Sequence, residues 1–387
     1  MQTTKAPDTP KGVLARLVAF DTTSHKSNLA IVAFIEDYLR GHGVASQRVT
    51  SSDGEKASLF ATIGPEGVPG VALSGHTDVV PVEGQVWSTE PFRLHAENGR
   101  LYGRGTADMK GYLACVLCAV PEFKRRTLKV PIHIVFSYDE ETGCIGVRPM
   151  IAEFSKSLQN PRMVFVGEPT SMKVVDAHKG PVRWHVDVTG RAAHSSMAHL
   201  GVNAISYATR LIGQLETIAA ELQKARDPRF NPPYATLQVT RLEGGTANNI
   251  IPVSCRFGFE IRSLASTNAA AVEARLRQFA ETHCVPEMCA VAPEAGIRIV
   301  CTNSVPPFAA DAKSEVVALA LKLSGQNETH TVSYATEAGL FQAGGAPSVV
   351  CGPGDIAQAH TANEWIAESE LDKCMAFLGH LADWAEG

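Results

Sequence analysis

Histidine and aspartate side chains that could bind a metal ion lie just beyond an apolar run in the first third of this sequence. His76 follows residues 71–74, whose composition is typical of a buried strand. Asp78 could accept a hydrogen bond from the second ring nitrogen of a metal-bound imidazole and so fix its tautomer. A turn histidine beside a solvated aspartate is the alternative interpretation.

Three consecutive acidic residues follow the apolar run 132–137. They are Asp139, Glu140 and Glu141. Such a concentration of negative charge at the end of a strand is unfavourable without a cation nearby. One carboxylate could therefore bind a metal ion while its neighbour acts as a base. The alternative is a solvated acidic turn.

Three further candidate ligands lie in short polar segments elsewhere in the chain. Glu168 follows the apolar run 163–166, and His360 follows the run 347–351 after a Gly-Pro-Gly turn. Asp108 follows a glycine-rich turn at the expected start of a helix. It could be an ordinary helix cap, or it could bridge two ions through its two oxygens.

Together these residues provide the donors of a two-metal site. In an open α/β sheet, ligand-binding residues collect beyond the carboxyl ends of the strands. Two histidines and three carboxylates suit two divalent ions, with zinc the natural choice and cobalt or manganese not excluded. Two ions that share a bridging carboxylate would lie about 3.5–4 Å apart.

Alternating strand-like and helix-like segments must position these side chains. Apolar residues at helical spacing predict helices at 27–42 and 110–123. Short apolar runs between and after these helices predict strands. This alternation favours an α/β fold with a largely parallel sheet covered by helices. The predicted strands of this part are residues 58–63, 71–74, 132–137 and 163–166.

The pattern changes near Pro181. Segments then follow in the order β-α-β-β-α-β, which predicts a small α+β domain of the ferredoxin-like kind. The α/β pattern returns from Ser333, so the small domain is inserted into the larger one. The expected bounds are 1–180 and 304–387 for the large domain and 181–303 for the insert.

The composition argues against several classes of protein. The chain has 387 residues and a formal net charge of -5 from 35 basic and 40 acidic side chains. That balance gives no electrostatic case for binding nucleic acid or an anionic membrane, and no apolar stretch is long enough to span a bilayer. Residues 1–10 lack the apolar core of a secretion signal. Nine scattered cysteines indicate free thiols in a reducing compartment, so we expect a cytoplasmic protein.

Five motifs give the chain a resemblance to a known family. They are, in order, SGHTDVVP, YGRGTADMKG, DEETG, GEPT and QAHTANEW. Over essentially its whole length the chain resembles the co-catalytic zinc hydrolases, which include acetylornithine deacetylase, succinyl-diaminopimelate desuccinylase, aminoacylase and a glutamate-releasing carboxypeptidase. The resemblance implies an enzyme with two zinc ions per subunit that hydrolyses the amide bond of a small N-acyl amino acid.

The same resemblance implies a role for each metal ligand. His76 and Glu168 would bind one zinc, Glu141 and His360 would bind the other, and Asp108 would bridge the two.

Two acidic residues are expected to support the reaction. Asp78 resembles the acid that orients His76, and Glu140 resembles the general base. Zinc lowers the pKa of a bound water from roughly 15.7 to about 7. Glu140 would then take the proton of the attacking water and deliver it to the leaving amine.

The inserted domain resembles the lid and dimerisation domain of the family. His194 would reach across a homodimer and help to hold the oxyanion in the partner's site, with an exposed loop histidine as the alternative. Asn249 and Gly354 would line the substrate site. Arg262 would pair with a substrate carboxylate, because arginine forms bidentate pairs with that group. A surface salt bridge is the alternative for Arg262.

Three strings, GEPTS, AHKG and YATEA, favour the acetylornithine deacetylase branch, although Ala335 departs from the residue expected there. Glu337, in the last string, could select the side-chain ammonium of N-acetylornithine, with Asp355 assisting. The expected reaction converts N2-acetyl-L-ornithine to L-ornithine and acetate, a step of arginine biosynthesis. The alternatives are a desuccinylase, a broad aminoacylase and, more remotely, an inactive binding protein on the same fold.

Overall fold

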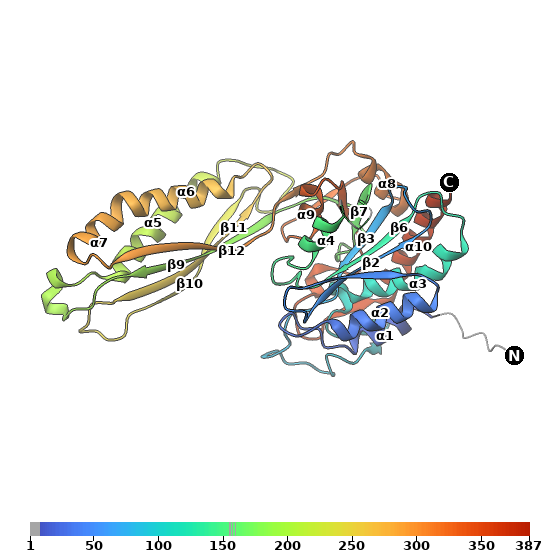
Figure 1. Cartoon of the computed structure of the whole chain (residues 1–387), viewed down its shortest axis with the longest axis horizontal. Coiled ribbons are helices and arrows are strands. Elements are labelled where there is room, and N and C mark those ends of the chain that lie inside the picture. Colours follow the sequence, from blue (N-terminus) through green and yellow to red (C-terminus); the bar gives the residue numbers. More distant parts are fainter. Residues whose placement is uncertain (1–7, 155, 157, 159) are drawn as a thin grey trace. The chain divides into compact units, whose positions relative to one another are not determined.

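The structure is a computed structural model that describes residues 8–154, 156, 158 and 160–387 (Figure 1). The first seven residues of the polar segment 1–10 lie outside this range. The described chain divides into two compact units, each with its own buried hydrophobic core. Within the described residues, no helix is both long and apolar enough to cross a membrane.

The first unit contributes most of a nine-stranded sheet. Its strands are β1 (Ser46–Thr50), β2 (Ala57–Ile63), β3 (Val71–His76), β6 (Ile132–Ser137), β7 (Met163–Val166), β8 (Val175–His178), β13 (Phe308–Ala309), β14 (His330–Val332) and β15 (Ser348–Val350). In space they follow the order β1-β2-β6-β3-β7-β15-β8-β13, with β14 paired to β8. The central strands β6, β3, β7 and β15 are parallel, whereas β1, β2 and β8 pair antiparallel. The predicted largely parallel sheet is therefore confirmed, with antiparallel strands toward its margins.

Helices cover this sheet, and a small three-stranded sheet accompanies it. The helices are α1 (Pro10–Val18), α2 (Leu29–Gly41), α3 (Gly111–Arg125), α4 (Val147–Glu153), α8 (Glu315–Ser324), α9 (Ala338–Ala343) and α10 (Glu368–Glu386), with the short turns η1 (Thr106–Lys110) and η4 (Ile356–Gln358). The small sheet pairs β4 (His95–Glu97), β5 (Arg100–Tyr102) and β16 (Trp365–Ala367). Residues 111–120 of α3 are almost all buried, and the helix packs against α1 and α10, which explains the apolar composition of this part.

The second unit is an antiparallel sheet with helices. Its elements are β9 (Gly180–Thr189), η2 (Ser195–Leu200), α5 (Ala204–Leu222), β10 (Thr236–Gly244), β11 (Ser254–Ser263), α6 (Ala269–Phe279), η3 (Ala280–Cys284), α7 (Val285–Val291) and β12 (Gly296–Ser304). The strands lie in the order β10-β11-β9-β12. This is the β-α-β-β-α-β arrangement that the sequence predicts.

The bounds of the units differ slightly from the predicted domain bounds. The second unit comprises His178–Phe308 and also Thr331–Ala335. The second segment belongs there because the Thr331 hydroxyl donates to the Arg229 carbonyl at 2.5 Å and the Ser333 hydroxyl to the Asn231 carbonyl at 3.0 Å. These hydrogen bonds join parts of the chain that are distant in sequence, so the apolar pattern does not reveal them.

Candidate metal centre

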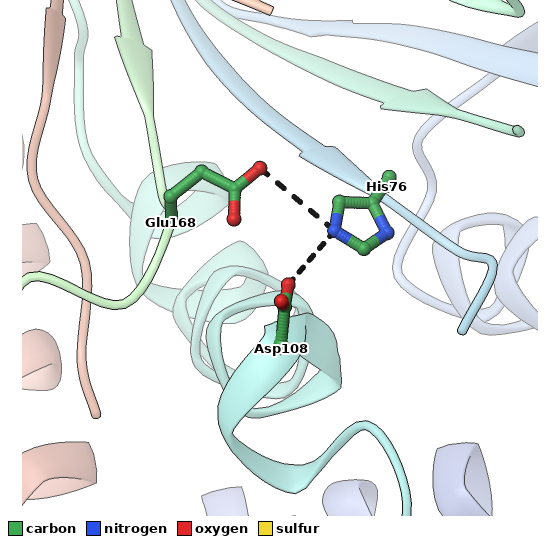
Figure 2. Close-up of side chains that lie close together, drawn as sticks. All are labelled: His76, Asp108 and Glu168. Atoms are coloured by element: carbon green, nitrogen blue, oxygen red, sulfur yellow. Dashed lines mark hydrogen bonds and ion pairs between the residues drawn. The ribbon is translucent and has the colours of Figure 1, made fainter. Parts of the chain in front are cut away.

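The carboxyl ends of the parallel strands bring the first set of predicted ligands together. His76 ends β3 and Glu168 follows β7, and these strands are neighbours in the sheet. Asp108 comes from the turn η1. The His76 Nε2 atom lies 3.0 Å from Asp108 Oδ1 and 3.8 Å from Glu168 Oε1 (Figure 2). All three side chains are buried.

A second set of predicted ligands shares Asp108. The His360 Nε2 atom lies 3.1 Å from Asp108 Oδ2 and 3.0 Å from Glu141 Oε2. Within each set the candidate ligand atoms all lie within 4.8 Å of one another. The two oxygens of Asp108 thus face different histidines, which is the arrangement that a bridging carboxylate requires.

The electrostatics of this cluster fit bound cations. Burial raises the pKa of Glu141 to about 7, reinforced by the negative charge of Asp108. Burial and the same aspartate raise the pKa of Glu168 well above its usual value. Burial would also raise the pKa of Asp108, but hydrogen bonds from the two histidines lower it overall. Several carboxylates gathered around two imidazoles favour an added positive charge, and carboxylate and imidazole are donors that divalent zinc accepts.

Asp78 has a wider role than the sequence predicts. The carbonyl of Asp78, not its carboxylate, is the nearer partner of His76 Nδ1, at 2.9 Å against 3.5 Å. Because a carbonyl only accepts hydrogen bonds, Nδ1 carries the proton and Nε2 is left for a metal. The Asp78 carboxylate accepts the backbone N–H groups of Glu140 at 3.1 Å and Glu141 at 3.3 Å. Asp78 therefore holds the acidic segment in place as well as the imidazole.

Glu140 lies beside the candidate metal ligands but belongs to neither candidate set. The thiol of Cys144 donates to Glu140 Oε1 at 3.3 Å. Burial raises the pKa of Glu140 to about 8; His76 opposes this rise and Glu141 reinforces it. A carboxyl group with a raised pKa next to a metal site is suited to accept a proton.

Glu337 occupies a buried, hydrogen-bonded position. Glu337 directly precedes α9, and this residue is only 1% exposed. The Ser74 hydroxyl donates to Oε2 at 3.0 Å, and the Ser137 hydroxyl donates to Oε1. Both oxygens therefore accept serine hydroxyls, which hold the carboxylate in place; selection of a substrate ammonium by Glu337 stays a prediction. The assisting residue, Asp355, caps η4 by accepting from Ala357 N at 2.9 Å.

Gly354 is enclosed by the protein. Its φ of 86° lies in the left-handed region that favours glycine. Its N–H donates to Glu370 Oε2 at 3.2 Å and its carbonyl accepts from Ser171 N at 2.6 Å. An added Cβ would lie 3.5 Å from Cα of Ala107, the residue before Asp108. A contact with substrate stays a prediction.

Two predicted site residues meet within the second unit. The backbone N–H of Ser195 donates to the Asn249 carbonyl at 3.0 Å, and His194 forms an antiparallel bridge with Ile250. The His194 side chain is exposed, and its Nδ1 lies 2.7 Å from the Ser196 hydroxyl. His194 and Asn249 are therefore neighbours on one surface of this unit.

Arg262 forms an ion pair in this structure. Its Nε donates to Glu260 Oε1 at 2.5 Å, and Arg183 Nε donates to the other oxygen of Glu260 at 2.6 Å. This is the salt bridge that the sequence offers as the alternative. A role in holding a substrate carboxylate stays a prediction.

Two buried charged residues near the ligands are absent from the predicted site. Arg104 and Glu364 pair at 2.7 Å and are each 1% exposed. Arg104 lies in the motif that contains Asp108, and Glu364 lies in the motif that contains His360. A charged residue inside each of these motifs was the available sequence signal. Their pairing joins two distant segments, which no local pattern shows.

Two candidate ligand sets that share one aspartate are typical of two-metal hydrolytic sites, and the family match that follows identifies a metal-dependent hydrolase. Residues 72–384 match peptidase family M20/M25/M40, and the chain belongs to this family. It is 36% identical over 374 residues to acetylornithine deacetylase of Myxococcus xanthus, covering 95% of each chain. It is 33% identical over 368 residues to acetylornithine deacetylase of Pasteurella multocida, covering 94% of this chain and 93% of that one.

Solved structures share the fold. An M20 family metallo-carboxypeptidase from Sulfolobus solfataricus superposes with a TM-score of 0.77 at 19% identity, covering 98% of this chain and 99% of that one. A dinuclear metal-binding M20 peptidase from Bacillus subtilis superposes with a TM-score of 0.64 at 15% identity, covering 96% and 97%. At these identities the likeness concerns the fold alone.

Proposed function

We propose that this chain is a two-zinc amidohydrolase that converts N2-acetyl-L-ornithine to L-ornithine and acetate. The observation that carries the proposal is the pair of ligand sets around Asp108, with Glu140 beside them. The acetylornithine deacetylases that match nearly the whole chain support the substrate. The proposed place of this reaction is arginine biosynthesis in the cytoplasm.

In this proposal the ligands divide between two positions. His76 and Glu168 would hold one zinc, Glu141 and His360 would hold the other, and Asp108 would be shared between the two sets. When bound, zinc supplies a Lewis acid that polarises the amide carbonyl and makes a water molecule acidic near neutral pH.

Glu140 carries out the proton transfers of the reaction. Glu140 accepts a proton from the water as the oxygen adds to the amide carbon. It returns that proton to the leaving nitrogen as the carbon–nitrogen bond breaks, which gives acetate and the free amine. Asp78 fixes the backbone of Glu140, and the Cys144 thiol orients its carboxylate. Bound cations would lower the pKa of Glu140, which burial raises to about 8, and so favour the ionised form that accepts a proton.

The second unit is proposed to act as a lid and as the surface of a homodimer. His194 would help to hold the oxyanion in the site of a partner subunit. Asn249 would line the substrate site beside it. Arg262 and Gly354 complete the proposed substrate contacts. Sedimentation that detects only monomers at working concentrations would contradict this arrangement.

A parallel assay tests the substrate. The zinc-loaded protein is offered N-acetylornithine, N-acetylmethionine and N-succinyl-diaminopimelate, and kcat/KM is measured for each. We expect N-acetylornithine to be preferred by at least about 10-fold, because a charged side chain is read by specific polar contacts. Preference for the succinyl compound would point to a desuccinylase. No turnover of any of them after zinc loading would contradict a deacylase.

Replacing Glu337 tests whether this residue selects between charged and uncharged substrates. Glu337→Gln is expected to lower kcat/KM for N-acetylornithine and for N-acetylmethionine by a similar factor, about 10-fold. The reason is that the carboxylate holds Ser74 and Ser137 rather than facing solvent. The two kcat/KM ratios are measured with the same zinc-loaded protein. A fall in kcat/KM for N-acetylornithine alone would instead support the direct contact between Glu337 and the substrate ammonium that the sequence predicts.

A further inference from the structure

The loop that carries the bridging aspartate wraps around one buried carboxylate. Glu364 Oε1 accepts the backbone N–H groups of Ala107 at 2.9 Å and Asp108 at 3.1 Å, and Oε2 accepts that of Gly105 at 3.0 Å. The carbonyl of Glu364 accepts the N–H of Gly103 at 2.9 Å. One residue thus satisfies four backbone groups of the loop and fixes the backbone of Asp108 itself.

The same carboxylate is paired with a buried arginine. Arg104 Nη1 donates to Glu364 Oε2 at 2.7 Å. A buried ion pair is a poor source of net stability, because removing both charges from water offsets most of their attraction. Such a pair is better explained by the geometry that it imposes.

Arg104 extends this network to a second ligand. Its Nη2 atom donates to Gln85 Oε1, and Gln85 Nε2 donates to the His360 carbonyl at 2.8 Å. Arg104 Nη1 also donates to the Thr361 carbonyl at 3.4 Å. The Trp87 ring covers the guanidinium at 5.1 Å, and its N–H donates to Gln85 Oε1 at 3.2 Å.

The two ligands joined in this way need external support. His360 lies on a loop with a φ of 60°, and its side chain is 49% exposed. Asp108 also lies on a loop, whereas His76 ends a strand and Glu168 lies two residues after the end of another. A metal site holds its ion tightly only when its ligands stay within about 0.5 Å of the productive geometry. The network supplies that constraint where the sheet does not.

We propose that Glu364, Arg104 and Gln85 are positioning residues that set the separation of Asp108 and His360, and with it the affinity of the metal position these ligands share with Glu141. Within the network the tasks differ. Glu364 holds Asp108, which serves both metal positions. Gln85 holds only His360, which serves one. This proposal rests on the two-metal function proposed above.

Titration of the metal-free full-length protein with Zn²⁺ against a chromophoric chelator tests the proposal. The wild-type protein is expected to take up two ions in two steps. Gln85→Ala should weaken one step by about 10- to 100-fold, the range typical of residues that support metal ligands, and change the other less than about threefold. Glu364→Gln should weaken both steps, because an amide offers a single acceptor oxygen to the loop and to Arg104.

A destabilised variant serves as the matched control. Leu378→Ala truncates a buried side chain of α10 outside the network and should lower the melting temperature while leaving both zinc affinities unchanged. The proposal is overturned if Gln85→Ala and Glu364→Gln fold and bind both ions with wild-type affinity. It is also overturned if Leu378→Ala weakens zinc binding as much as they do. Because no substrate is present, these outcomes are independent of which acyl amino acid the protein hydrolyses.

Discussion

Turnover by the Glu140→Gln variant is expected to fall by about 10²- to 10⁴-fold, the usual contribution of a positioned general base. Glutamine keeps the size of the side chain and can still accept the Cys144 thiol, but it cannot take a proton from water. Because Glu140 belongs to neither ligand set, the bound metal should stay near two ions per chain. Metal content and kcat are measured on the same preparation.

The neighbouring glutamate provides the control for this experiment. Glu141→Gln removes a carboxylate that faces His360, so it should lower the metal content as well as turnover. The two variants differ only in which of two adjacent glutamates becomes an amide. If Glu140→Gln loses metal and Glu141→Gln keeps it, the roles of base and ligand are exchanged.

Asp108→Asn is expected to reduce the bound zinc from two ions per chain to one at most and to lower turnover at least about 100-fold. Outer residues that support metal ligands typically contribute about 10- to 100-fold to affinity, and a ligand shared by two ions should contribute more. Asparagine has one acceptor oxygen, so it cannot face both His76 and His360 as the aspartate does. Elemental analysis after gel filtration measures the zinc content.

The same chemical change at another buried aspartate provides the comparison. Asp176→Asn alters a side chain in β8 that accepts the Thr329 hydroxyl at 2.7 Å and belongs to neither ligand set. This variant should retain two zinc ions. An Asp108→Asn protein that retains both ions as well would contradict the bridging role.

The candidate ligands at the strand ends could be predicted from the sequence, because each follows a short apolar run in the same segment. A short apolar run marks a buried strand, and a histidine or carboxylate directly after it must lie at the sheet edge. His76 and Glu168 are of this kind. Glu140 and Glu141 could not be told apart by this argument, since both follow the same strand, and the family resemblance made that assignment.

The other features depend on contacts between distant segments. Glu337 has the chemistry of an ammonium-binding group, and the fold also brings the hydroxyls of Ser74 and Ser137 into hydrogen bonds with its two oxygens. Arg104 and Glu364 are ordinary surface types by composition, yet the fold buries them as a pair.

The sequence by itself determined the fold class and the donor atoms of the site, because periodicity and residue type are properties of short segments. Only the tertiary structure decided that each oxygen of Asp108 faces a different histidine. It also decided that Asp78 holds the acidic segment and that Glu364 holds the loop of Asp108. These arrangements follow from how separate segments pack together, and a hydrogen bond between such segments leaves no periodic trace in either one.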